Sequence, residues 1–457
     1  MITLFLNHFR GFTDTFIPLD EVNFLVGENS TGKTSVLTAL RVLCGHIVWT
    51  LGRFQVDNEV LGSIGEFVPK DTDWFQIGFF RREPSVENGY DAALFTFTGW
   101  AGTIPVLMDV RLRVGDTEIH FQCAGALQYQ VKSVTENIEA GFRHWTTLDP
   151  STLDELSPLE SSGVFDTDGP MGMISALHAQ QYESYTEQMN AWYKANEEEL
   201  EWSRKKKQTG APRPPLPERP TTPRSFPVML HCIDDIEWLA AIRAKPRRSY
   251  DHVVGPYSAE GDHIPWRLRG LSERSKLREW LRDYGQRSGL YDDIEARKFG
   301  KDLDAPFEIR VRFGEQTPNV TNVGYGVSQV LPVVTSVLQP NRPGDWFALQ
   351  QPEVHLHPRA QAALGDVFYD MALAPNDKRF LIETHSDYMV DRFRTRMRKA
   401  AGKGETSPRA QVLFFERIEG ENVVHRLPLT PDGDYPEEQP EAFRAFFLEE
   451  ELRNLGY

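Results

Sequence analysis

The stretch GENSTGKT, residues 27–34, decides the fold of this chain. It has the pattern of a phosphate-binding loop, G-x-x-x-x-G-K-[ST], and it lies between an apolar run, EVNFLVGE, and an amphipathic run, TSVLTALRVLC. These runs predict a strand before the loop and a helix after it, which is the context in which such a loop cradles a polyphosphate. The sequence therefore predicts a site for a nucleoside triphosphate.

The glycines, the lysine and the threonine of the loop each have an expected role in binding phosphate or its metal ion. Gly27 and Gly32 permit the tight turn that aims successive N–H groups at a phosphate. Lys33 is expected to reach the β- and γ-phosphates, and the Thr34 hydroxyl is expected to coordinate Mg²⁺. A nucleoside triphosphate and Mg²⁺ are therefore the predicted ligands. The predicted nucleotide-binding residues are Gly27, Asn29, Ser30, Thr31, Gly32, Lys33, Thr34 and Ser35.

The composition predicts a globular chain of two or three structural units, since it has 457 residues, 40% of them hydrophobic and 25% charged. No apolar stretch reaches the roughly 20 residues that span a bilayer, and the N-terminus enters a strand pattern without a signal peptide. We therefore expect a cytoplasmic protein without membrane contacts. The three cysteines, Cys44, Cys123 and Cys232, fit neither a metal site nor a disulfide framework.

The formal net charge of −16 argues against a protein that coats nucleic acid through bulk electrostatics. Two local basic segments remain. Residues 241–301 carry 14 Lys and Arg against 9 Asp and Glu, and residues 389–403 carry six basic residues against one acid. Such runs are more often solvated helix faces than binding surfaces. Nucleic acid bound through these local patches stays an alternative partner.

Shifts in composition divide the chain into a core and an insertion. Within the insertion, alternating runs such as ALFTFTG predict antiparallel strands, residues 183–207 predict a long charged helix, and the prolines between 212 and 227 predict an extended connector. An acidic tail follows the core. The predicted segments are residues 1–59 (first part of the core), 60–230 (insertion), 231–430 (second part of the core) and 431–457 (tail).

Three further motifs follow in the second half of the chain. NVGYGVSQVLPVV (322–334) is a glycine-bearing turn that opens a helix, FALQQPEVHLHP (347–358) ends an apolar strand on two glutamines, and RFLIETHSDYMVDR (379–392) ends another strand near a histidine. The last two motifs begin with short apolar runs, and RAQAALGDVFYDMALA lies between them. This arrangement predicts buried parallel strands with a crossover helix.

Together, the four motifs make the chain resemble ABC-type ATPases of the RecF, SMC and OLD-like class, often grouped with the AAA family ATPases. Within this class it most resembles the stand-alone ATPases of bacterial anti-phage systems such as the Septu type. The resemblance covers roughly residues 1–45 and 230–430, and the insertion shares none of it. It implies an α/β fold: an ABC-type P-loop ATPase core with a mixed sheet, an antiparallel β subdomain and a helical insertion.

The resemblance also implies roles for particular residues. His385 resembles the switch histidine that senses the γ-phosphate, and Leu356-His357-Pro358 resembles a loop that crosses a dimer interface. Arg243 lies in a basic segment and is expected to face phosphate or a partner. The implied assembly is a homodimer or higher oligomer in which each subunit completes its partner's site. The residues that resemble the signature loop acting in trans are Gly324, Gly326, Ser328 and Gln329.

Gln350 and Gln351 stand where the resembling proteins carry acids. In those proteins the first acid supports Mg²⁺, and the second acts as general base or orients the attacking water. An amide accepts hydrogen bonds but carries no charge and takes no proton at neutral pH. The predicted catalytic residues are Gln350, Gln351 and His385, and the predicted metal-binding residues are Thr34 and Gln350. Because amides stand at positions 350 and 351, we expect the hydrolysis of ATP to be slow.

Three explanations of the two glutamines stay open at this point. Gln351 is native, and catalysis relies on His385, a positioned water or Glu353. Alternatively, one glutamine replaces a glutamate and traps the nucleotide-bound state. In the third explanation, the protein is a natural ATP-binding switch with little hydrolysis.

The sequence favours a separate effector, a nuclease or a toxin, in anti-phage defence. The acids of the last part of the chain, Glu416, Asp432 and Asp434, are too crowded for a nuclease domain, and PDGD predicts a turn. One alternative function is a DNA-repair ATPase that binds DNA directly. Another is a non-hydrolysing, ATP-bound scaffold that sequesters an effector.

Overall fold

The chain forms two compact units in the computed structural model. The first unit comprises Gly11–Arg41 and Ile233–Tyr457, and the second comprises Ile2–Arg10 and Val42–Cys232. The predicted segment boundaries stay predictions, and the predicted helix at 183–207 and connector at 212–227 lie outside the described residues, apart from isolated positions. The structure describes residues 2–56, 59–82, 90–100, 102–114, 117–123, 128–133, 157–158, 236–251, 257–300, 305–339 and 346–445, with isolated positions between 170 and 191.

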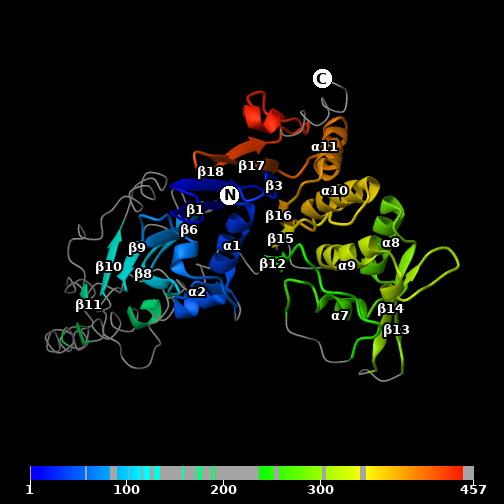
Figure 1. The fold of residues 1–457 in the computed structure, drawn as a ribbon, viewed down its shortest axis with the longest axis horizontal. Helices are drawn as coiled ribbons and strands as arrows, with labels where there is room; N and C mark the ends of the chain where they lie inside the picture. Colours follow the sequence, from blue (N-terminus) through cyan, green and yellow to red (C-terminus); the bar gives the residue numbers. More distant parts are fainter. Residues whose placement is uncertain are drawn as a thin grey trace, which may run out of the picture. The chain divides into compact units, whose positions relative to one another are not determined.

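A six-stranded mixed sheet forms the centre of the first unit, in the order β12-β15-β16-β3-β17-β18 (Figure 1). The first five strands pair in parallel, and β18 pairs antiparallel with β17. Every residue of β3 is buried, as expected for a parallel strand covered on both faces. The predicted parallel strands are confirmed. Their bounds are β3 (Val22–Gly27), β12 (Ile236–Leu239), β15 (Trp346–Gln350), β16 (Arg379–Glu383), β17 (Ala410–Ile418) and β18 (Glu421–Pro428).

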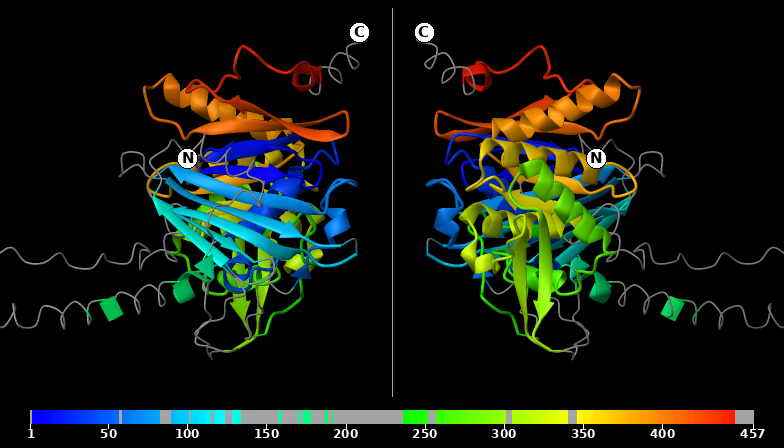
Figure 2. Two further views of the ribbon diagram at one scale, coloured as in Figure 1. Left: turned by 90° about the vertical axis from the view of Figure 1, so that its left-hand side faces the viewer. Right: turned by 90° about the vertical axis from the view of Figure 1, so that its right-hand side faces the viewer.

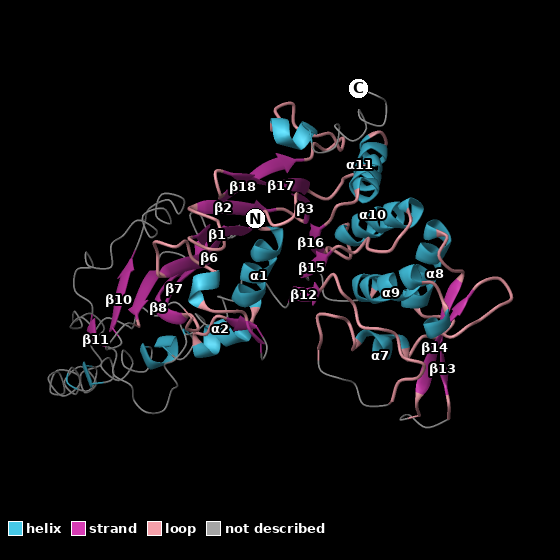
Figure 3. Cartoon of the chain, viewed as in Figure 1, coloured by secondary structure: helices cyan, strands magenta, loops and turns pink. Residues whose placement is uncertain are grey.

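Helices follow the strands of this sheet where the sequence predicts them. α10 (Pro358–Ala372) is the crossover from β15 to β16, and it packs against α8 (Lys276–Ser288), α9 (Tyr325–Leu338) and α11 (Asp387–Ala401), as Figure 3 shows. Leu277, Leu281 and Tyr284 of α8 are buried in this core. Among the described residues, none of the helices combines the length and apolar character needed to cross a membrane. The remaining helices of the unit are α1 (Lys33–Cys44) and α7 (Ile264–Leu268).

Smaller elements complete the first unit. They are β2 (Thr15–Leu19), β13 (Asp293–Lys298), β14 (Phe307–Arg312) and the short helix η3 (Val320–Asn322). The predicted turn at PDGD is confirmed, since the N–H of Gly433 donates to the carbonyl of Thr430 at 2.8 Å. Phe443 is buried and packs on Phe414 and Tyr435, so the first part of the tail docks on its own unit. The tail beyond residue 445 lies outside the described residues.

The second unit is built on an antiparallel sheet whose strands run in the order β11-β10-β9-β8-β7-β6-β1 (blue to cyan in Figure 2). This confirms the predicted antiparallel strands. Rings of Phe9, Phe54, Phe67 and Phe75 pack at its centre with centroids 4.9–5.8 Å apart. The bounds are β1 (Ile2–Asn7), α2 (His46–Leu51), β4 (Gln55–Val56), β5 (Glu59–Val60), η1 (Ile64–Glu66), β6 (Trp74–Arg82), β7 (Tyr90–Thr98), β8 (Val106–Val114), β9 (Thr117–Gln122), β10 (Gln128–Ser133) and β11 (Ser157–Pro158).

A row of buried polar side chains crosses four strands of this sheet. Asn7 donates to Gln76 at 3.2 Å, Gln76 donates to Thr96 at 3.3 Å, and Thr96 donates to Asp109 at 3.2 Å. Burial raises the pKa of the Asp109 carboxyl, although Arg111 and Thr96 act to lower it. A slip of one residue in any strand would turn its side chain to the other face of the sheet and leave its buried partner without a hydrogen bond, so the row favours a single register.

Several arginines of the predicted basic segments form ion pairs within the first unit. Arg267 lies 2.6 Å from Glu237, and Arg396 of α11 lies 2.6 Å from Asp370. The first pair joins α7 to β12 and the second joins α11 to α10, so these two arginines serve packing within the unit.

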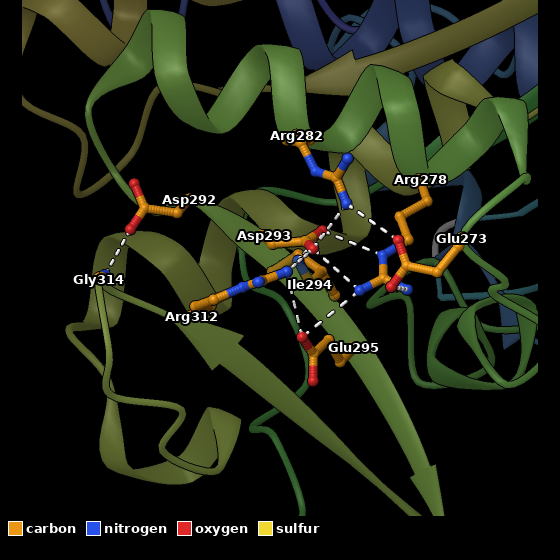
Figure 4. Close-up of polar contacts among 9 residues, drawn as sticks. All are labelled: Glu273, Arg278, Arg282, Asp292, Asp293, Ile294, Glu295, Arg312 and Gly314. Carbon is orange, nitrogen blue, oxygen red and sulfur yellow. Dashed lines mark hydrogen bonds and ion pairs between the residues drawn. The ribbon is translucent and has the colours of Figure 1, made fainter.

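The strongest of these ion-pair groups surrounds Asp293, whose side chain is 1% exposed (Figure 4). Arg278 and Arg282 from α8 and Arg312 from β14 all converge on this carboxylate. Burial acts to raise the pKa of Asp293, but the hydrogen bonds from Arg278 and Arg282 outweigh it and hold the pKa at about 2. The carboxylate thus joins α8 to the β13–β14 hairpin. Two glutamates lie at the rim of the cluster, Glu273 and Glu295.

Replacing Asp293 with alanine is expected to lower the free energy of unfolding by about 2–4 kcal/mol, less than a fully buried pair would lose because Arg282 and Arg312 are partly exposed. In the wild type this stabilisation is complete above the unfolded pKa of 3.8 and is lost as the pH falls toward 2. Urea unfolding at pH 7 and through the acid range measures both effects. The exposed Asp432→Ala is the control, and equal stabilities of the two variants would contradict the assigned role.

Candidate functional site

The phosphate-binding loop lies between the end of β3 and the start of α1, as predicted. Asn29 and Ser30 are exposed, and the Thr31 hydroxyl donates to the carbonyl of Glu28 at 2.8 Å. Within the described residues, the backbone N–H groups of residues 28–32 donate no hydrogen bond to the protein. These free donors, followed by the N-terminus of α1, form a site suited to a polyphosphate.

Two glycines of the loop have no room for a side chain. Gly27 has φ +144°, and a Cβ there would lie 2.2 Å from the carbonyl oxygen of Phe415. Gly32 has φ +94°, and a Cβ there would lie 2.5 Å from the ring of Phe12. Both positions therefore require glycine, for sterics as well as for backbone conformation.

Lys33 is buried with its ammonium group on the loop itself. Its Nζ donates to the carbonyls of Gly27 at 2.9 Å and Glu28 at 2.6 Å. Burial lowers the pKa of Lys33, while Glu383 and Glu28 act to raise it. The lysine thus lies at the loop, where its charge would meet a bound phosphate.

The end of β16 carries an acid that the sequence analysis missed. Glu383 is 6% exposed and accepts hydrogen bonds from the Thr34 hydroxyl at 3.2 Å and from the Gln350 amide at 3.3 Å. Gln350 and Glu383 are register partners in the parallel pair β15–β16. The structure therefore brings the two predicted metal-binding residues together around a third side chain. The signal was present in RFLIETHSD, where an acid ends the strand before the histidine.

Gln351 continues from β15 with φ +41°, and its main chain is held from two sides. Its N–H donates to the Glu383 carbonyl at 2.8 Å. Arg243 donates to the carbonyls of Gln350 at 2.8 Å and Gln351 at 3.2 Å. The prediction that Arg243 faces phosphate or a partner is wrong. This side chain is 3% exposed, and its guanidinium donates to main-chain carbonyls of the same chain.

Burial lowers the pKa of Arg243 to about 10, and Glu353 opposes this effect. Burial in turn raises the pKa of Glu353, whose Oε1 accepts from the N–H of His385 at 2.8 Å. Glu353 thus fixes the main chain beside His385. Burial also lowers the pKa of His385 and Lys33 lowers it further, although Glu383 acts to raise it, and the net effect favours the neutral imidazole.

The predicted signature residues lie at the N-terminus of α9, where Gly324 and Tyr325 are exposed. The Ser328 hydroxyl donates to the carbonyl of Tyr325 at 2.9 Å, and Gln329 is buried. A Cβ on Gly326 would lie 2.7 Å from the carbonyl oxygen of His355. The signature turn therefore packs closely on the EVHLHP segment, and the contacts of Ser328 are to its own helix.

A hydrogen-bonded path joins the switch-histidine loop to this segment. The Ser386 hydroxyl caps α11 and donates to Gln361 Oε1 at 2.7 Å, and Gln361 Nε2 donates to the carbonyl of Leu356 at 2.8 Å. The His355 ring lies edge-on to Tyr325 with centroids 5.0 Å apart. Ser386, Gln361 and Leu356 thus connect the end of β16 to the signature turn.

The oxygen atoms at the ends of β15 and β16 and at the start of α1 are suitable ligands for a hard cation. Thr34, Glu383 and Gln350 supply oxygen atoms, the ligand type that Mg²⁺ prefers. Among the described residues there is no group of three or more His, Cys, Asp or Glu side chains that could hold a metal. A cation at this place would therefore need further ligands, which the phosphates of a nucleotide provide.

Two segments of the chain match family models. Residues 1–62 match the family described as "AAA ATPase domain", and residues 262–391 match the family described as "AAA domain, putative AbiEii toxin, Type IV TA system". Both segments are similar to AAA-type ATPase domains. The first contains the phosphate-binding loop, and the second contains the signature turn, the glutamine pair and His385.

Several solved structures are similar to this chain at low identity. The SMC head domain from Thermotoga maritima is 10% identical, covering 94% of this chain and 98% of that chain with a TM-score of 0.38. The Smc head domain from Pyrococcus furiosus, bound there to the C-terminal domain of ScpA, is 10% identical over 99% and 100%, with a TM-score of 0.39. The recombination mediator RecF is 10% identical over 92% and 97%, with a TM-score of 0.29. A search of curated proteins gives no match.

Replacing Arg243 with methionine is expected to lower the free energy of unfolding by about 2–4 kcal/mol, because two buried carbonyls lose a charged donor. Chemical denaturation measures the change, and the exposed Arg248→Met is the matched control. A stability of Arg243→Met equal to that of the control would show that the guanidinium does not hold the end of β15.

Proposed function

We propose that this chain is an ABC-type ATPase of the RecF and SMC class that binds ATP with Mg²⁺ and hydrolyses it slowly. The observation that carries the proposal is the loop of residues 27–34, with free N–H donors and a buried lysine, beside the polar ends of β15 and β16. The matches of both core segments to ATPase domains support it.

The roles of the residues follow from their chemistry. Lys33 leaves the loop carbonyls and pairs with phosphate oxygens, which carry more charge than the carbonyls it now contacts. Thr34 is the loop residue that would hold Mg²⁺, which supplies charge neutralisation at the phosphates when it is bound. Gln351 orients the attacking water but takes no proton from it, so turnover is slow. Neutral His385 can accept or donate a hydrogen bond at the γ-phosphate.

The assembly that we propose is a homodimer or higher oligomer in the cytoplasm, in which Gly324, Gly326, Ser328 and Gln329 complete the partner's site. The exposure of Gly324, Tyr325 and His357 supports this arrangement, since these positions are open to a second chain. The nucleotide state of this dimer would control a separate nuclease or toxin in anti-phage defence. Support comes from the match of residues 262–391 to a family whose description names a toxin of a toxin–antitoxin system.

A second candidate function is an ATP-bound scaffold that hydrolyses nothing, and the glutamine pair favours it. Direct binding of DNA by a repair ATPase gains less support, because the formal net charge is −16 and several arginines of the basic segments are used in ion pairs. Measurements of ATP binding and turnover separate the first two functions.

Lys33→Ala is expected to weaken ATP binding by about 10- to 100-fold, which corresponds to roughly 1.5–3 kcal/mol for a lost hydrogen bond to a charged group. Isothermal titration calorimetry with ATP measures the loss, with the exposed Lys403→Ala as control and unfolding temperatures to verify the fold. Wild-type affinity in the folded Lys33→Ala protein would remove the basis of the nucleotide site.

Gln351→Glu is expected to raise the ATPase kcat, by up to the roughly 10²- to 10⁴-fold that a general base contributes. Phosphate release under saturating ATP and Mg²⁺ measures it, and Gln316→Glu makes the same chemical change at an exposed turn. If neither the wild type nor Gln351→Glu releases phosphate while both bind ATP, the scaffold function replaces the ATPase function.

A further inference from the structure

The sheet places one carboxylate nearer to the phosphate-binding loop than either glutamine. In the strand order β12-β15-β16-β3, β16 lies between the glutamine-bearing strand and the strand that leads into the loop. Glu383 is in register with Gln350 on one side and with Leu25 on the other. An acid at the end of β16 therefore lies one strand closer to Gly27 than an acid at the end of β15.

The side chain of Glu383 contacts residues of α1 and β15. Thr34, from the first turn of α1, donates its hydroxyl to both carboxylate oxygens, at 3.2 and 3.4 Å. Gln350 donates its amide to Oε2 at 3.3 Å. The side chain is 6% exposed, and its charge acts on both Lys33 and His385. A carboxylate this deeply buried is retained only where cations or donors offset its charge.

We propose that Glu383 is the carboxylate of the magnesium site, and that Gln350 is the amide that positions it. The inference rests on the proposed function, since the cation enters with ATP. Mg²⁺ in nucleotide sites uses one or two protein oxygen ligands together with phosphates and waters. Thr34 and Glu383 supply such a pair, Thr34 from the first turn of α1 and Glu383 from the end of β16, the strand that pairs with β3.

This assignment changes the meaning of the amide at position 350. A carboxylate there would stand directly beside Glu383, and two neighbouring carboxylates repel each other. An amide instead donates a hydrogen bond and adds no charge. Gln350 is thus the residue type that a carboxylate on β16 requires. Gln350→Glu alone is expected to disturb the site and not to repair it.

The test compares ATP affinity with excess Mg²⁺ and with EDTA, by calorimetry on the full chain. Three variants accompany the wild type: Glu383→Gln, the exposed control Glu405→Gln, and the exchange variant Gln350→Glu/Glu383→Gln, which swaps acid and amide between register partners. Glu383→Gln should reduce the ratio of the two affinities by about 10- to 100-fold and leave the affinity in EDTA unreduced. The exchange variant should recover part of the ratio. Electron paramagnetic resonance of Mn²⁺ with ATP gives a second readout that needs no turnover.

The inference is overturned if folded Glu383→Gln keeps the wild-type ratio, or if it loses affinity equally in Mg²⁺ and EDTA. If Glu383→Gln fails to fold, the exchange variant decides: a folded exchange variant with a magnesium-dependent affinity supports the inference, and one without it overturns it. A wild type that binds no ATP in either buffer refutes the proposed function itself. If instead ATP binding depends on Mg²⁺ but is unchanged in Glu383→Gln, only the role of Glu383 is refuted.

Discussion

The parallel pairing of β16 with β15 on one side and with β3 on the other is the constraint on which the site depends. Main-chain hydrogen bonds fix these registers, so the carboxyl ends of three strands meet at one edge of the sheet. The N–H of Thr384 continues this pairing to the carbonyl of Leu25 at 3.1 Å. Thr34 and Glu383 therefore meet because the sheet places them there, without a loop rearrangement.

Buried charges of alternating sign surround this edge. Lys33 lies beside Glu383, and Arg243 lies beside Glu353. Each of these groups would be costly to bury alone, and each is offset by a partner or by backbone groups. Arg243 in particular donates hydrogen bonds to the carbonyls of Gln350 and Gln351 at the end of β15. The buried guanidinium of Arg243 thus stabilises the main chain at Gln351, which has φ +41°.

Much of the first unit could be predicted from the sequence because its motifs are local. The phosphate-binding loop is one contiguous pattern, and the runs VNFLVG, WFALQ and RFLIE each show the apolar character of a buried parallel strand. Glu383 and Arg243 could not be placed in this way. Their roles depend on which residues the register brings opposite each other, and Gln350 and Glu383 are 33 positions apart. The polar row from Asn7 to Asp109 was missed for the same reason, since its members come from four separate strands.

The amide of Gln361 has a mechanical consequence. Its oxygen is taken by Ser386 and its nitrogen by the carbonyl of Leu356, so neither end is free to adapt. Gly326 lies so close to His355 that a Cβ on it would be 2.7 Å from the His355 carbonyl oxygen. One side chain therefore links the main chain after β16 to the segment that faces the signature turn. A shift of the main chain at Ser386 would have to move Gln361 with it or break one of these two hydrogen bonds.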